Sequence, residues 1–77
     1  MTHDRRPSVR YDKARDVLYL RFGPSVDCRS EPDDDLEGLV FRYSLADDKL
    51  NGVTVVWYSR QDKSALSRKI PCPVHLP

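Results

Sequence analysis

The chain has 77 residues, a formal net charge of +1 at pH 7 and two cysteines. Because domains commonly comprise about 100–150 residues, this length allows one domain, and two cysteines exclude a framework of several disulfides. The longest mainly apolar run, residues 53–58, is far short of the ~20 residues of a membrane span, so we expect a cytoplasmic protein with no membrane contact.

Two strands are predicted in the first third of the chain. Residues 8–11 form the first, and the polar residues 12–16 connect it tightly to the second. Residues 17–22 are rich in branched and aromatic side chains, which favours a strand. Because side chains alternate between the faces of a strand, Leu18 and Leu20 share one face of the predicted sheet.

The middle of the chain predicts three further strands. Residues 26–30 are expected to form an edge strand, followed by an acidic loop. Residues 39–45 alternate again, which places Leu45 on the apolar side of that strand. Gly52 then suits a bulge at the start of the next strand. Residues 53–58 are β-branched or aromatic at every position, so this strand belongs in the centre of the sheet.

A short helix is predicted after the last strand. Ser59 suits the N-cap, because its hydroxyl group can accept a hydrogen bond from a free amide. Leu66 and Ile70, four positions apart, form one apolar stripe, and Pro71 ends the helix. The fold class is therefore α+β, a small antiparallel β-sheet of four or five strands with one short C-terminal helix.

The predicted organisation is a flexible basic arm at residues 1–7, a single α+β domain at 8–70 and a Pro-rich extended tail at 71–77. All seven aromatic residues lie in the domain, and we expect Trp57 in its core. One short helix cannot cover a sheet that is apolar on both faces. A second copy of the chain is the simplest cover for the other face, so we expect a homodimer.

Charge is distributed unevenly along the chain. Residues 1–15 carry a net charge of +3, residues 26–48 carry −6 and residues 60–77 carry +3. An acidic centre favours docking of a basic protein partner. The candidate partner-binding residues are the acidic side chains of this centre and two aromatic ones: Glu31, Asp33, Asp34, Asp35, Glu37, Tyr19 and Trp57.

Three motifs follow one another in this order along the chain. The opening is Tyr-Asp-x-x-x-Asp-Val-Leu-Tyr-Leu-x-Phe at 11–22. An acidic loop precedes Gly-Leu-Val-Phe-x-Tyr at 38–43, and Asp-Asp-Lys-Leu-x-Gly-Val-Thr-Val follows at 47–55. Between residues 9 and about 66, the chain thus resembles the small prokaryotic proteins of the domain-of-unknown-function family twenty-two eighty-three.

The resemblance implies a β-rich fold with a short C-terminal helix, in agreement with the reading of the residues. It brings no catalytic or binding residue to this chain. Members of that family are sometimes encoded beside a small toxin-like protein, which implies an antitoxin-like role and a protein partner encoded nearby. The chain departs from the family pattern in its bulky Val-Val-Trp-Tyr ending at 55–58 and in the tail after residue 70.

Metal binding and catalysis have little support in the sequence. Cys72 and His75 have a Cys-x-x-His spacing that Cys28 and His3 would have to complete, without any Cys-x-x-Cys pair. The contiguous aspartates at 33–35 lack the alternate spacing of a calcium loop. The two histidines lie at opposite ends of the chain, where they cannot serve one catalytic cleft. We therefore expect no cofactor, no metal and no enzymatic activity.

Two functions remain from the sequence. The first is a non-enzymatic, homodimeric protein-binding module, with an antitoxin-like role as its sharpest form. The alternative is a small nucleic-acid-binding module that uses the basic N-terminal arm and the C-terminal helix. The arm comprises Arg5, Arg6, Arg10, Lys13 and Arg15, and the basic residues of the helix are Arg60, Lys63, Arg68 and Lys69. In that alternative, aromatic side chains would stack on bases.

Overall fold

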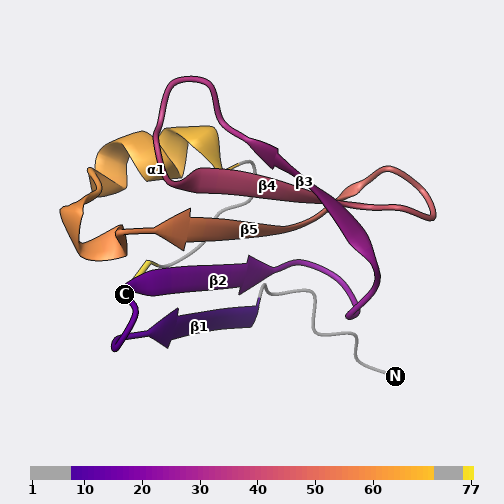
Figure 1. Cartoon of the computed structure of the whole chain (residues 1–77), viewed down its shortest axis with the longest axis horizontal. Coiled ribbons are helices and arrows are strands. Elements are labelled where there is room, and N and C mark those ends of the chain that lie inside the picture. The colour runs from indigo at the N-terminus through magenta and orange to yellow at the C-terminus, as the bar shows by residue number, and fades with distance from the viewer. Residues whose placement is uncertain (1–7, 71–75) are drawn as a thin grey trace.

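The computed structural model describes residues 8–70 and 76–77, which form a five-stranded antiparallel sheet with one short helix (Figure 1). This architecture confirms the α+β fold class. No helix among the described residues is long and apolar enough to span a membrane. The predicted arm at 1–7 and most of the predicted tail, 71–75, lie outside the described residues. The elements in chain order are β1 (Ser8–Asp12), β2 (Val17–Arg21), β3 (Cys28–Pro32), β4 (Leu39–Ser44), β5 (Leu50–Val56), the 3-10 turn η1 (Tyr58–Arg60) and α1 (Lys63–Lys69).

The strand order is β1-β2-β5-β4-β3, and every pair is antiparallel. The strand β5 lies in the centre, as its apolar residues on both faces predicted. The strands β1–β2 and β3–β4–β5 are each neighbours along the chain as well as in the sheet. Residues 22–27 join these two groups by crossing one end of the sheet (Figure 1).

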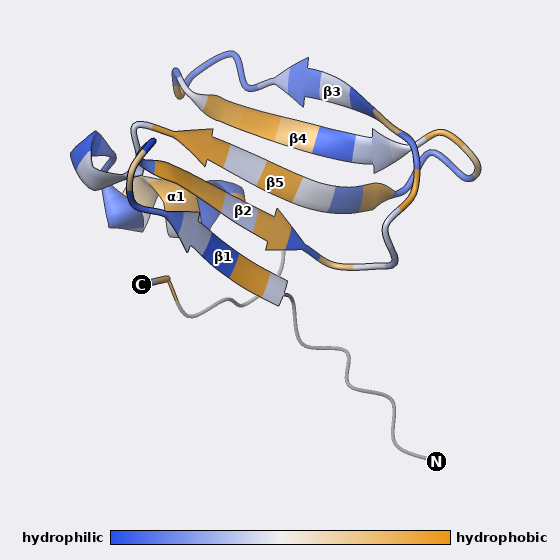
Figure 2. Cartoon of the chain, turned by 60° about the horizontal axis from the view of Figure 1, so that its bottom comes forward, coloured by the Kyte–Doolittle hydropathy of each residue, from blue (hydrophilic) through white to orange (hydrophobic). Residues whose placement is uncertain are grey.

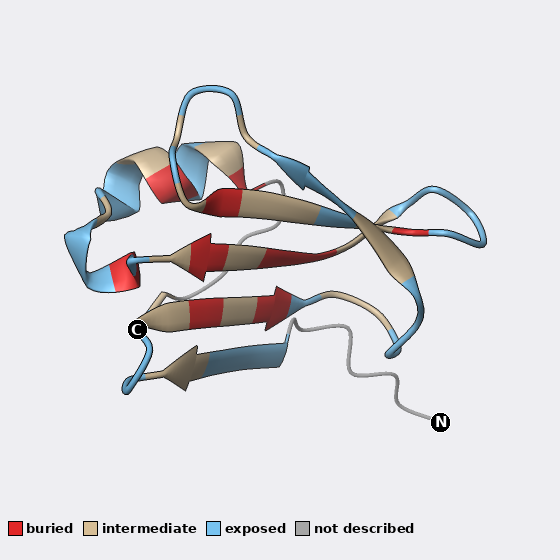
Figure 3. Cartoon of the chain, in the orientation of Figure 1, coloured by how far each residue is buried: buried red, intermediate tan, exposed pale blue. Residues whose placement is uncertain are grey.

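The hydrophobic core lies between α1 and one face of the sheet, which we call the helix face. Leu18 pairs with Val55 in register, and Val55 pairs with Leu39, so their side chains share this face. Leu66 and Ile70 of α1 complete the buried cluster, as their four-residue spacing predicted. Figure 3 shows the buried residues on the inner strands, whereas β1 and β3 hold only half-buried and exposed ones.

The edge strand β3 begins two residues later than predicted. Residues 24–27 are used to cross the end of the sheet, so they cannot join the ladder. Their path is fixed from a distant strand, because Asn51 Nδ2 donates to the Pro24 carbonyl oxygen at 3.1 Å. The backbone N–H of Leu45 also donates to the Asp27 carbonyl oxygen, at 3.0 Å. Pro32 can end β3 because an edge strand does not need every N–H group for the ladder.

The N-cap of α1 is Asp62, and the prediction of Ser59 was wrong. Asp62 Oδ1 accepts a hydrogen bond from the backbone N–H of Ser64 at 3.0 Å. Ser59 lies in η1, where both its hydroxyl and its N–H groups donate to Asp16, at 2.6 and 2.9 Å. Ser59, which the sequence assigned to the N-cap, therefore binds Asp16, a residue distant in the sequence.

Two large apolar residues predicted to face the core are exposed. Trp57 is 46% exposed, and its left-handed backbone (φ 56°) turns the chain out of β5. Leu45 is 64% exposed, because the strand β4 ends at Ser44 and the hairpin turn begins there. The expectation of a core position was therefore wrong for Trp57, and Tyr58 is buried in its place.

The last two residues of the chain lie against the helix face. Leu76 packs against the hydrophobic cluster, and the Tyr58 hydroxyl group donates to the Pro77 main-chain oxygen at 2.5 Å. Tyr11 meets Tyr58 edge to face, with ring centroids 5.4 Å apart. The helix face is thus covered by α1, by the Tyr58 turn and by Leu76. These contacts leave the opposite face of the sheet, the open face, without a covering element among the described residues.

Candidate functional site

The strand register sorts the open face into three rows that run across the sheet. The first, which we call the arginine row, takes one residue from each strand: Ser8, Arg21, Gly52, Arg42 and Ser30. The second, the tyrosine row, comprises Arg10, Tyr19, Thr54, Val40 and Pro32. The third, the valine row, comprises Asp12, Val17 and Val56.

The open face therefore changes from polar to apolar along the strands. The valine row is apolar at Val17 and Val56, whereas the arginine row carries two charges; Figure 2, which colours residues of both faces, shows the hydrophobic start of β4 and end of β5. Val17, Val40 and Val56 are half-buried, whereas Arg21 and Arg42 are exposed. The polar end carries the positive charge of this face.

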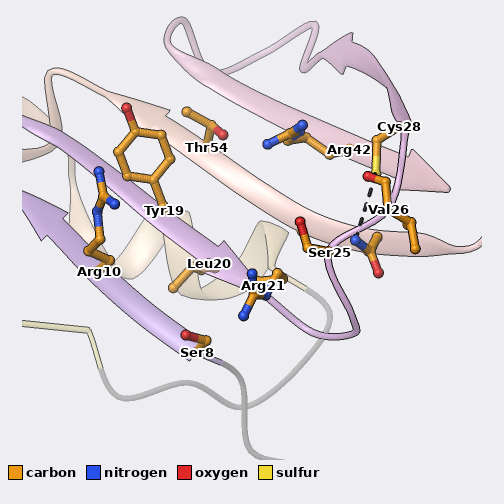
Figure 4. Close-up of a pocket in the computed structure, with 12 residues that line it drawn as sticks. Ser8, Arg10, Tyr19, Leu20, Arg21, Ser25, Val26, Cys28, Arg42 and Thr54 are labelled. Atoms are coloured by element: carbon orange, nitrogen blue, oxygen red, sulfur yellow. Dashed lines mark hydrogen bonds between the residues drawn. The ribbon is translucent and has the colours of Figure 1, made fainter.

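A hollow of about 490 Å³ lies over the arginine and tyrosine rows (Figure 4). Arginines from three strands line it, and its lining contains no aspartate or glutamate. The lining residues are Ser8, Arg10, Tyr19, Leu20, Arg21, Ser25, Val26, Cys28, Arg42, Asn51, Gly52 and Thr54. Three cations with hydroxyl and amide groups around them form a lining that suits an anion.

Gly52 explains why the arginine row is hollow at its centre. A Cβ atom at Gly52 would lie 2.6 Å from the Leu20 carbonyl oxygen, so the close approach of β2 excludes any side chain there. Arg21 and Arg42 stand on the neighbouring strands, one on each side of Gly52. The fold itself thus leaves a position without a side chain between the two strand positions that carry arginine.

One wall of the hollow is the crossing segment, residues 22–27, together with the start of β3. Asn51 is the extra residue of a β-bulge opposite Arg42 and Tyr43, which confirms the irregularity expected beside Gly52. Besides its bond to Pro24, Asn51 Nδ2 lies 3.7 Å from Cys28 Sγ. The bulge therefore directs the side-chain amide of Asn51 toward the crossing segment, and its hydrogen bond to Pro24 holds this wall in place.

Arg10 and Tyr19 form a pair in the tyrosine row. The Arg10 guanidinium carbon lies 5.1 Å from the centroid of the Tyr19 ring, within the range of a cation–π interaction. Figure 4 shows the two side chains next to each other, with Thr54 on the following strand. This contact orders a flat guanidinium group and a flat ring at one end of the hollow.

Three other cations among the described residues, Arg15, Arg29 and Lys69, pair with carboxylates, whereas Lys13, Lys49, Arg60, Lys63 and Arg68 have no such partner there. Arg29 pairs with Asp48 at 2.6 Å and with Glu31 at 2.9 Å, and the hydrogen bond to Asp48 above all raises the pKa of Arg29. Lys69 pairs with Asp35 at 2.8 Å, which raises the pKa of Lys69. Within residues 8–70, by contrast, Arg10, Arg21 and Arg42 have no carboxylate partner.

The predicted acidic surface is engaged largely within the molecule. Asp33 Oδ2 accepts hydrogen bonds from the backbone N–H groups of Leu36 and Asp35, at 2.8 and 3.0 Å, and these bonds lower the pKa of Asp33. Lys69 Nζ also lies 3.5 Å from Asp33 Oδ1. The acidic loop is thereby fastened to the last turn of α1. Asp34 and Glu37 remain exposed.

The structure does not gather the predicted partner-binding residues into one site. Tyr19 lies in the middle of the open face, whereas the acidic residues lie in β3 and the loop that follows it. Trp57 follows β5, and its ring lies 3.5 Å from the position that a Cβ atom of Gly38 would occupy. Of the predicted residues, only Tyr19 lines the hollow.

Arg10 was predicted as part of the basic arm, but Arg21 and Arg42 were missed because the three arginines of the hollow are far apart in the sequence. Each occupies an outward position next to a core residue, as Arg21 does beside Leu20. Pairing the predicted strands in register would have found them. The basic residues of α1, in contrast, belong to the element that covers the helix face.

No group of three or more His, Cys, Asp or Glu residues is placed to hold a metal ion among residues 8–70 and 76–77. Three of the four candidate zinc ligands, His3, Cys72 and His75, lie outside the described residues. The chain matches no protein-family model, no curated protein and no solved structure. The resemblance to family twenty-two eighty-three therefore stays a prediction.

Proposed function

We propose that this protein is a small, non-enzymatic nucleic-acid-binding module that binds its ligand on the open face of the sheet. The observation that carries the proposal is the hollow, which Arg10, Arg21 and Arg42 line together with no carboxylate from the part of the chain that the structure describes. Arginine binds phosphate groups well, because its planar guanidinium fork matches pairs of phosphate oxygens, as it also matches the paired oxygens of carboxylates. The site therefore differs from the arm and helix suggested by the sequence.

The shape of the face supports a long ligand. The rows extend across five strands, so a chain molecule can lie along them and make several contacts. The overall charge of the protein is only +1, which means that a local cluster rather than a basic protein as a whole would attract the phosphates. Each phosphate contact releases counterions, so binding must weaken steeply with salt.

The test is fluorescence anisotropy with a labelled single-stranded oligonucleotide, at low and at physiological salt. Arg42→Ala should weaken binding about tenfold, the usual effect of losing a charge-assisted hydrogen bond. Arg68→Ala removes an equally exposed arginine from α1 and should change affinity by less than about twofold. Absence of binding at low salt would refute the proposal, as would equal losses in the two variants.

A protein partner is the second candidate function, and the apolar end of the open face favours it. Val17, Val40 and Val56 are only half-buried, and Trp57 is 46% exposed. Apolar side chains of this kind gain by contact with a second copy or with a partner encoded nearby. The arginine rows of two copies would repel one another face to face, so pairing would have to use the valine end.

Light scattering during size-exclusion chromatography tests self-association. A homodimer should have twice the mass of one chain in this measurement. The Val17→Lys variant should have the mass of one chain. A tagged protein that is co-expressed with the product of the adjacent gene tests the other partner. Elution as one subunit at high concentration, with no bound partner, would contradict this candidate.

A further inference from the structure

We propose that the hollow binds one nucleotide unit of a single strand, with its phosphate shared by Arg21 and Arg42 above Gly52 and its unpaired base on the Arg10–Tyr19 pair. This inference rests on the nucleic-acid binding proposed above. It adds the form of the nucleic acid and the position of each part of the nucleotide. The two positions lie on adjacent rows of the same face.

The shared phosphate follows from the arginine row. Neighbouring strands lie about 4.8 Å apart, so the backbones that carry Arg21 and Arg42 are roughly 10 Å apart, with Gly52 between them. An arginine side chain is long enough to reach inward from either side, so both guanidinium groups could contact one phosphate over this gap. A phosphate can offer two oxygens to each fork, which relieves the repulsion between the two cations.

The base position follows from the tyrosine row. This row is two residues further along each strand, about 6.6 Å at ~3.3 Å per residue, a separation on the scale of one nucleotide. Tyr19 presents an aromatic ring there, and the Arg10 guanidinium carbon lies over this ring, 5.1 Å from its centroid. Both groups stack on bases. Thr54 lies opposite Tyr19 in register and offers a hydroxyl group to the edge of the base.

A single strand satisfies this arrangement better than a duplex. The base of a duplex is stacked and paired, so it cannot lie flat on Arg10 and Tyr19 without being extruded. The wall formed by Ser25, Val26 and Cys28 also bounds the hollow on one side, where a second strand would have to pass. The phosphate position alone would accept a single strand or a duplex. The base position therefore accounts for the preference for a single strand.

A double-mutant cycle tests the shared phosphate, with a labelled single strand of about twelve nucleotides as the probe. Arg21→Gln and Arg42→Gln should each weaken binding about tenfold, and the double variant should lose far less than a hundredfold, because one phosphate contact cannot be lost twice. Losses that multiply to about a hundredfold would show two separate contacts and overturn the shared phosphate.

Lysine substitutions separate this inference from the proposed function. Arg21→Lys and Arg42→Lys retain both charges but lose the planar fork. If the two arginines share a phosphate, the double lysine variant should bind about as weakly as the double glutamine variant. Full affinity in the lysine variant would overturn the inference and leave electrostatic nucleic-acid binding intact. Absence of binding by the unmodified protein would refute both. All four substitutions are at exposed positions, and circular dichroism should show folded variants.

Three competitor molecules and two variants of Tyr19 test the base position. The unlabelled single strand should compete at least tenfold better than its duplex or than a mononucleotide. Tyr19→Leu should weaken binding about tenfold, whereas Tyr19→Phe, which keeps the ring, should stay within about twofold. A duplex that competes equally, or a leucine variant that binds normally, would overturn the base position. Equal competition by the mononucleotide would show that the hollow binds free nucleotides and not a strand.

Discussion

Asp16 accepts a hydrogen bond of 2.6 Å from the hydroxyl group of Ser59, 43 positions later in the chain. The same carboxylate accepts a second bond from the Ser59 N–H group at 2.9 Å, and a third from the Tyr11 hydroxyl group at 2.5 Å. The Asp16 backbone has a positive φ of 57°. One residue of the β1–β2 turn thus fixes the end of β5 and the turn that leads to α1.

Replacing the Asp16 carboxylate should therefore loosen the fold and change its response to acid. The Ser59 and Tyr11 hydrogen bonds lower the pKa of Asp16 below its ordinary value of 3.8. Because the pKa of Asp16 is lower in the folded than in the unfolded state, the ionised carboxylate stabilises the fold at pH values above the ordinary pKa. This stabilisation is lost as the pH falls through the folded-state pKa. Asp16→Asn should lower Tm at pH 7, and its Tm should fall less than that of the parent between pH 5 and pH 3.

Thermal melts followed by circular dichroism at several pH values measure this difference. Asp34→Asn is the matched control, since Asp34 is an exposed aspartate in the acidic loop. It should leave both Tm at neutral pH and its dependence on acid close to those of the parent. Parallel curves for the parent and for Asp16→Asn would contradict the assigned role of Asp16.

The exposure of Trp57 gives a second prediction. Trp57→Ala should destabilise the fold by about 1 kcal/mol or less, because almost half of the side chain is already in water. Leu18→Ala is the comparison within the core, where the side chain is 0% exposed, and should cost about 2–5 kcal/mol. Urea unfolding of both variants measures the two values. A larger loss for Trp57→Ala than for Leu18→Ala would show that the tryptophan is buried.

Gly38 should be intolerant of any side chain. Its φ is +88°, and a Cβ atom would lie 2.7 Å from the Val56 carbonyl oxygen and 2.9 Å from Gln61 Nε2. Gly38→Ala should cost roughly 2 kcal/mol or more. At Gly23 the closest atom to a Cβ would be the movable side-chain oxygen of Asn51, so Gly23→Ala should cost less. Urea unfolding ranks the two variants, and the reverse order would contradict this account.

Cys28 reports on the hollow, because its thiol group lies in the wall. In a Cys72→Ser variant, the rate of Cys28 modification by a thiol-reactive dye should fall several-fold when a single-stranded oligonucleotide is added. A ligand on the open face would shield the thiol group from the reagent. An unchanged rate at saturating oligonucleotide would mean that the ligand lies elsewhere, for example on α1.

Most of the sheet could be predicted from the sequence, because its signals are local. Branched and aromatic residues mark β2, alternation marks β4, and the β-branched residues 53–56 mark the central place of β5. The predictions of element boundaries were wrong where a contact with a distant residue determines the local structure. Asn51 holds the crossing segment and so shifts β3, and Asp16 binds Ser59 and so leaves the helix cap to Asp62.

The candidate site was much less accessible to sequence reasoning. Tyr19 was identified twice, as a partner-binding residue grouped with an acidic surface that the fold keeps elsewhere and, in the alternative, as a side chain that stacks on bases. Arg21 and Arg42 become neighbours only through the register of β2, β5 and β4. The gap between them depends on the missing side chain of Gly52, which appears in the sequence only as a strand irregularity. Register is a property of the whole sheet, so no short motif carries it.

The β1–β2 hairpin and the β3–β4–β5 meander share one ladder, between β2 and β5, and are linked by the crossing segment and by the contacts of Asp16 and Tyr11 with the turn after β5. Arg10 and Arg21 belong to the hairpin, whereas Arg42 belongs to the meander. An anion that bridges Arg21 and Arg42 would therefore hold the hairpin and the meander together. Amide hydrogens along that ladder should then exchange more slowly in the complex, and the whole sheet should open as one unit.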